Sequence, residues 1–267
     1  MHPLIVQAVV IAAGWDAWRW YVARVTAVPE EAATLAVLAA LLVFLGAPRI
    51  LRREPDFSVP LVPVAALLAA YAVSHAFAPP LIRCAIATTA ALTPLALAAF
   101  RGRPPLAFWG LVALAMPVLP SLQFATGYPM RIASAALTAA LMQGQGLYVA
   151  REGTFLIWRG EMVQFDAPCS GVNMLWAGLL LTLVACVLFR LSAPRTAVAA
   201  TVCVAVTIVA NALRAASLFY VEAGFLPWAT PPWWHEGAGL VAFAMGAAAM
   251  LWAVMRLNAG GPVRWPG

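Results

Sequence analysis

Long apolar stretches, each about as long as a bilayer is thick, alternate with short polar loops along most of the chain. A helix needs about 20 apolar residues to cross a membrane. By that measure, apolar segments lie near residues 3–23, 31–47, 59–78, 81–99, 105–121, 170–190, 196–221 and 235–256. The pattern predicts an all-α integral membrane protein, built as a bundle of about eight transmembrane helices. Asp16 and Arg19 interrupt the first segment, and their spacing allows them to pair on one helix face.

The stretch 122–168 departs from this pattern. Its apolar run 129–143 is predicted to be an amphipathic or peripheral helix at the outer interface. Between residues 147 and 165, aromatic and β-branched residues are interrupted by a Glu-Gly and an Arg-Gly pair, which is typical of two or three short strands joined by turns. The bundle is therefore predicted to carry a small extracytoplasmic cap, made of a β-hairpin and the peripheral helix.

Composition supports a membrane protein. The chain is 64% hydrophobic and only 10% charged, whereas soluble domains carry about 25% charged residues. All sixteen basic residues are Arg, and the formal net charge is +6. Because these arginines are scattered between apolar segments, they act as topology markers and do not indicate nucleic-acid binding.

The arginines are unevenly divided between the two sides of the predicted bundle. Those that follow the second, fourth, sixth and last segments are expected in the cytoplasm: Arg49, Arg52, Arg53, Arg101, Arg103, Arg190, Arg195, Arg256 and Arg264. Eight crossings then leave both termini inside and residues 122–168 outside. We expect one polytopic membrane domain over residues 1–267, with N-terminal spans (1–121), an extracytoplasmic segment (122–168) and the spans that carry the candidate site (169–256).

The segment 164–173 joins the outer polar stretch to the sixth apolar segment. Pro168 and Gly171 bracket Cys169 and Ser170, which indicates a turn. A thiol is therefore predicted at the mouth of the bundle, where water and a peptide can reach it. The Ser170 hydroxyl is expected to cap the helix that follows.

The other cysteines are not predicted to be catalytic or to bind metal. Cys186 and Cys203 fall inside apolar segments, where a thiol behaves as a small hydrophobe, and are expected to be inert packing residues. The four cysteines lack the spacing of metal ligands. We expect neither a metal site nor a cofactor.

Three polar residues are predicted at the outer level of the bundle. Asn211 and Arg214 share a face of the seventh segment, with Arg214 about 28 Å from the inner face. A charge inside a span is by default a functional candidate, although a residue that merely snorkels to the interface is the alternative. His235 opens the eighth segment after a Trp-rich stretch typical of an interface, where a plain interfacial role is also open.

These residue types together suit acyl transfer. A nucleophilic Cys needs a base, or a cation that favours its thiolate. A tetrahedral intermediate needs a donor for its oxyanion, which a guanidinium can supply. Cys169, Arg214 and His235 provide both, if the predicted topology holds.

With these motifs the chain resembles the exosortase/archaeosortase family of membrane transpeptidases. The resemblance covers roughly residues 140–256 and rests on Ala167-Pro168-Cys169-Ser170-Gly171, on Asn211-Ala212-Leu213-Arg214, and on His235 with Gly239. The resemblance implies that Cys169, Arg214 and His235 are catalytic, with Asn211, Ser170 and Gly171 in support.

The resemblance also implies a function. It predicts a cysteine-type endopeptidase or transpeptidase in the bacterial cytoplasmic (inner) membrane, with its active site on the extracytoplasmic side. Its substrates would be exported proteins with a C-terminal sorting signal, made of a Pro-Glu-Pro type motif, a transmembrane helix and a basic tail. Membrane lipid and an amine acceptor of unknown identity are the other expected partners; water is the alternative acceptor, and no nucleic acid is expected.

Two other classes stay open. In a small membrane transporter, Asn211 and Arg214 would line a substrate path. Such a protein would also have further ionisable residues near the midplane and inverted repeats, and neither appears in the sequence. In a non-catalytic membrane scaffold, Cys169 would serve only for packing. Asp166 and Glu222 are candidate partners of His235 or Arg214, or else solvated interfacial carboxylates.

Overall fold

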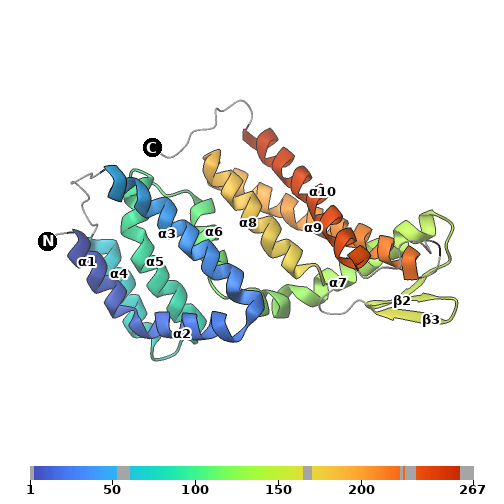
Figure 1. Cartoon of the computed structure of the whole chain (residues 1–267), viewed down its shortest axis with the longest axis horizontal. Coiled ribbons are helices and arrows are strands. Elements are labelled where there is room, and N and C mark those ends of the chain that lie inside the picture. Colours follow the sequence, from blue (N-terminus) through green and yellow to red (C-terminus); the bar gives the residue numbers. More distant parts are fainter. Residues whose placement is uncertain (1–2, 53–60, 165–169, 223–224, 226–232, 259–267) are drawn as a thin grey trace. The chain divides into compact units, whose positions relative to one another are not determined.

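Helices make up most of the structure, a computed structural model that describes residues 3–52, 61–164, 170–222, 225 and 233–258 (Figure 1). The chain divides into two compact units near residue 118, and each is described by itself. The first unit contains α1 (Pro3–Ala13), α2 (Trp15–Ala27), the 3-10 helix η1 (Pro29–Glu31), α3 (Ala32–Arg52), α4 (Leu61–Ser74), α5 (Pro80–Ala99) and α6 (Leu106–Leu114). The second contains α7 (Leu119–Gly144), β1 (Ala150–Glu152), β2 (Phe155–Trp158), β3 (Glu161–Gln164), α8 (Val172–Leu188), α9 (Ala193–Glu222) and α10 (Trp233–Asn258).

The first predicted span, 3–23, is broken at Gly14 into α1 and α2. The Trp18 indole Nε1 donates a hydrogen bond to the Ile11 carbonyl at 2.9 Å across this break. A Cβ at Gly14 would lie 2.8 Å from the same indole nitrogen, so glycine makes room for the closure. The break puts Asp16 and Arg19 on α2, outside the apolar α1, and the predicted pair between them is present at 3.2 Å.

A buried ion pair marks the sharp turn from α2 to α3, where the two helices meet at 118°. Arg24 Nε lies 2.9 Å from a carboxylate oxygen of Glu31, which is fully buried. Nearby, the Tyr21 hydroxyl donates to the Ala115 carbonyl at 2.9 Å. A buried charge is tolerated only with such a partner, so these contacts fix the turn.

Helix α7 differs most from the elements that the sequence predicted. The sequence predicted that a span ends at 121 and that a separate peripheral helix covers 129–143. The structure instead has one helix from Leu119 to Gly144 with Pro129 inside it, so both predicted boundaries are wrong. The chain breaks earlier, around Pro117, between α6 and α7. One face of α7 is buried along its whole length, which identifies it as an element packed into its unit.

Three short strands follow α7, in the stretch predicted to contain two or three. They form an antiparallel sheet in the order β1-β2-β3. Arg159 and Gly160 both have positive φ, at 52° and 86°, as a tight type I′ hairpin turn requires. The sheet packs on α7 and the end of α9 through one buried cluster: Ala135, Ala139, Met142, Val149, Leu156 and Phe219.

The helices differ in whether they are long and apolar enough to cross a membrane. All eight predicted apolar segments fall on helices, but α5, α9 and residues 236–258 of α10 are the ones long and apolar enough to cross alone. Two bent pairs, 15–45 and 106–144, meet the same criterion when each is taken together, which gives up to five spans among the described residues. The apolar helices α4 and α8 are shorter, at 14 and 17 residues. The chain is an α-helical multi-pass membrane protein, and the count of eight crossings stays a prediction.

Candidate active site at the start of α8

The start of α8 is held tightly against α9. Gly171, the residue before the helix, has φ 78°, a left-handed conformation that L side chains rarely adopt. A Cβ at Gly171 would lie 3.0 Å from Cγ of Asn211, so the backbone of this turn rests directly on the Asn211 amide. Ser170 and Asn211 are both almost fully buried, with 2% and 1% of their surface exposed.

Helix α7 supports both sides of this contact. Its Gln123 Oε1 accepts a hydrogen bond from the Ser170 hydroxyl at 3.0 Å. Its Ser134 hydroxyl accepts from Nδ2 of Asn211 at 3.1 Å. One turn further along α7, the Thr138 hydroxyl donates to the Ala212 carbonyl at 3.3 Å. The α8 turn and the middle of α9 are thus fixed to one helix by buried polar contacts.

The predicted contact of Ser170 with the start of α8 is present, although the N-cap residue itself is Gly171. Its hydroxyl accepts a hydrogen bond from the backbone N–H of Val172, the first residue of α8, at 3.3 Å. With the Gln123 contact, this hydroxyl is fully engaged in holding the turn. Ser170 therefore acts as a structural residue beside the predicted nucleophile.

Arg214 lies one helical turn beyond Asn211 and contacts α10. Its Nε would lie 3.2 Å from a Cβ placed at Gly239, so the absence of a side chain there lets the guanidinium approach the α10 backbone. His235 belongs to α10, four residues and about one turn before Gly239. Arg214 is half-buried, with its Nε atom out of contact with solvent.

Cys169 and Asp166 lie outside the described residues, as does the side chain of His235. The three described thiols, Cys84, Cys186 and Cys203, are fully buried, so Cys186 and Cys203 are the packing residues that the sequence predicted. Within the described part of the chain, no three His, Cys, Asp or Glu side chains gather as a metal site.

Comparison with known proteins decides the family. The family model of the transmembrane exosortases (Exosortase_EpsH) matches residues 1–252 of the 267. The chain belongs to the transmembrane exosortase family. Neither the curated proteins nor the solved structures gave a match. Membership in the exosortases supports a membrane transpeptidase type of function, and the match extends the sequence resemblance from residues 140–256 to nearly the whole chain.

Sequence reasoning missed two α7 residues, Gln123 and Ser134, that support the candidate site. Gln123 and Ser134 lie 47 and 77 residues from their partners Ser170 and Asn211. A local motif cannot show such pairings. The available signal was polarity, because both residues interrupt an apolar helix in which an unpaired polar side chain is costly.

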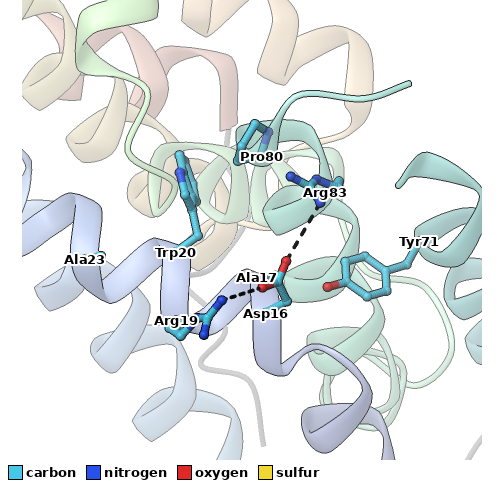
Figure 2. Close-up of a pocket in the computed structure, with 8 residues that line it drawn as sticks. All are labelled: Asp16, Ala17, Arg19, Trp20, Ala23, Tyr71, Pro80 and Arg83. Atoms are coloured by element: carbon cyan, nitrogen blue, oxygen red, sulfur yellow. Dashed lines mark hydrogen bonds and ion pairs between the residues drawn. The ribbon is translucent and has the colours of Figure 1, made fainter. Parts of the chain in front are cut away.

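A pocket that several charged residues line lies in the first unit (Figure 2). It has a volume of about 230 Å³ and is lined by Asp16, Ala17, Arg19, Trp20, Ala23, Tyr71, Pro80 and Arg83. Figure 2 shows the Asp16 carboxylate between the two guanidinium groups, 3.2 Å from Arg19 and 3.8 Å from Arg83. The Arg83–Asp16 pair joins α2 to the start of α5, so a charge that interrupts the first predicted span has a structural use.

Replacing Gly171 with Ala is expected to loosen the candidate site. The new Cβ meets the Asn211 amide at 3.0 Å and the residue keeps an unfavourable left-handed φ. Gly160→Ala is the matched control, since Gly160 has φ 86° with nothing within 4 Å of its Cβ position. Both variants lose about 1–2 kcal/mol of stability because alanine must adopt a left-handed backbone conformation. Gly171→Ala alone adds a steric clash. Thermal unfolding in detergent should show a larger loss for Gly171→Ala. Equal losses would mean that the Asn211 contact is unimportant.

Proposed function

We propose that this exosortase is a cysteine transpeptidase that cleaves the C-terminal sorting signals of exported proteins at the outer face of the bacterial cytoplasmic membrane. The substrate signal comprises an acidic Pro-Glu-Pro type motif, an apolar helix and a basic tail. One observation carries the proposal: the Gly171–Asn211 contact joins the turn after Cys169 to the helix turn before Arg214.

The proposed chemistry assigns one task to each residue. The Cys169 thiolate attacks the scissile carbonyl carbon, and the oxyanion that forms is stabilised by the Arg214 guanidinium. His235 protonates the leaving amine as the peptide C–N bond breaks, which leaves a thioester on Cys169. An amine acceptor or water then attacks the thioester and regenerates the thiol. Asn211, Ser170 and Gly171 hold this arrangement in place.

The location of the buried polar contacts supports these assignments. The Gln123–Ser170 and Ser134–Asn211 hydrogen bonds hold the residue that follows Cys169 in the sequence and the residue one helical turn before Arg214. Catalytic groups must be held to within a fraction of an ångström, and hydrogen bonds from neighbouring residues are the usual means. A scaffold with an inert Cys169 gives no reason for such a network at this turn.

Co-expression with a tagged substrate tests the proposed function. The reporter is an exported protein with the acidic motif, an apolar helix, a basic tail and a C-terminal epitope. Cells that contain the exosortase should lose the epitope and retain a shortened reporter, because cleavage occurs before the helix. A reporter with its acidic motif scrambled is the control and should stay full-length. Identical epitope levels in both reporters, with or without the exosortase, would refute the proposal.

A further inference from the structure

A long groove runs between α9 and α10 in the second unit. It has a volume of about 800 Å³ and an almost wholly apolar lining. The lining residues are Ala205, Val206, Val209, Ala210, Leu213, Arg214 and Ser217 on α9, and Gly237, Ala238, Val241, Ala242, Met245, Gly246 and Ala249 on α10. On each helix they recur every three or four residues, so each contributes one continuous face over three turns, about 18 Å.

Small residues form the floor of this groove. A Cβ at Gly246 would lie 3.4 Å from the Ala210 methyl, which shows how closely α9 and α10 approach. Larger side chains stand exposed on the walls, with 47% of Val209 and 60% of Met245 accessible. Helix α10 is also poorly covered: 22% of its most apolar stretch is buried, against 50% for that of α5. An apolar face of this length that the described residues of the unit leave open is suited to another helix, because small residues let helix backbones approach closely in membranes.

The groove is polar and positively charged at one end. Arg214 and Ser217 lie there, with the Ser217 hydroxyl donating to the Arg214 carbonyl at 2.7 Å. The groove therefore ends at the proposed oxyanion donor, next to the Asn211–Gly171 contact that leads to Cys169. A partner that is apolar along its length and acidic at one end matches this distribution of charge.

We propose that the α9–α10 groove binds the apolar helix of the substrate's sorting signal, in an orientation that brings the acidic motif to the Arg214 end. This inference rests on the proposed function and adds the place where the substrate binds. The guanidinium attracts the motif toward Cys169 through its field, while its N–H donors stay directed to the oxyanion. The bound helix then holds the motif near Cys169 at a high effective concentration, which lowers KM without changing the chemical step.

Disulfide cross-linking tests the docking without depending on catalysis. The enzyme carries Cys169→Ala, so that the substrate is not cut, together with Met245→Cys in the middle of the groove. The reporter carries a single cysteine, scanned through its apolar helix. Leu240→Cys is the matched control: it lies on the same helix, is 70% exposed and does not line the groove. Under a mild oxidant, Met245→Cys should cross-link at several times the yield of Leu240→Cys, at reporter positions spaced three or four residues apart.

A kinetic test uses the same two positions in the active enzyme. Met245→Trp should raise KM for the full reporter about tenfold or more, since extra volume in a packed contact is costly, with little change in kcat. Leu240→Trp should leave KM unchanged. Cleavage of a short soluble peptide with the motif alone should be the same in both variants and in the wild type.

The outcomes separate the docking from the chemistry. Equal cross-linking at residues 245 and 240, or an unchanged KM in Met245→Trp, overturns the groove proposal and would mean that membrane lipid fills this space. Strong cross-linking at residue 245 with no cleavage by the wild type would support the docking and refute the proposed function. Cleavage by the wild type without cross-linking at residue 245 would support the proposed function and refute the docking.

Discussion

Cys169→Ala is expected to abolish processing of a tagged substrate while the protein still inserts and accumulates normally. Without the thiol no thioester can form, and loss of a catalytic nucleophile lowers turnover by about a thousandfold or more. Immunoblots should show full-length reporter at the level seen in cells that lack the enzyme. The measurement is the ratio of shortened to full-length reporter.

Two other cysteines of the chain serve as controls for the loss of processing in Cys169→Ala. Cys186→Ala and Cys203→Ala remove thiols that are fully buried in α8 and α9. Both variants should process the reporter, with at most a modest loss of thermal stability from the small cavity that each leaves. If all three alanine variants behaved alike, the nucleophile would have to be another residue.

Arg214→Lys is expected to insert normally and yet be nearly inactive. If Arg214 only anchored the end of α9, Lys would replace it, because both long side chains reach the interface. A developing oxyanion instead requires the fixed fork of guanidinium donors, which an ammonium does not reproduce. Loss of one oxyanion donor costs about 2.7–4 kcal/mol, or roughly a hundred- to thousandfold in kcat.

Arg195→Lys is the matched control, since Arg195 is an exposed residue in the first turn of the same helix. It should process at close to the wild-type rate. Initial rates on the reporter give the comparison. Activity of Arg214→Lys within a few-fold of wild type would reduce Arg214 to a positional anchor and leave Cys169 and His235 to act as a pair.

Helix positions were predictable from hydrophobicity, but helix boundaries were not. The Pro129 and Pro117 positions illustrate the difficulty: both are potential helix breaks, and the chain breaks at Pro117 and continues through Pro129. A proline inside a helix removes one hydrogen-bond donor, and neighbouring groups can satisfy the carbonyl that is freed. Which proline ends a helix therefore depends on packing that a sequence pattern does not contain.

The helix break at Gly14 was also not predictable from the hydrophobic pattern. The apolar run suggested one span, and the pair Asp16–Arg19 was correctly predicted but placed inside it. Closure of the break depends on Trp18 folding back onto Ile11, a side-chain contact with no signature in hydrophobicity. The charged residues were the clue, since α2 carries them just outside the apolar helix.

The sequence named candidate site residues, whose roles stay a prediction, but it did not show the residues that support them. Cys169, Arg214 and His235 were selected because their types and topological level suit acyl transfer, and the family match agrees with the resemblance that named them. The contact of Gly171 with Asn211, and the α7 residues that hold both sides, depend on long-range packing. Those contacts place Gly171 of the first motif against Asn211 of the second.

An affinity label tests the central claim, that Cys169 is a nucleophile on the outer face, most directly. A peptide with the sorting motif, a charged group that prevents membrane crossing and a C-terminal chloromethyl ketone is added to right-side-out membrane vesicles. The account predicts alkylation of Cys169, located by mass spectrometry of the peptide that contains it, and protection by an uncleavable substrate analogue. Alkylation only in inside-out vesicles, or activity lost through modification of a different residue, would contradict it.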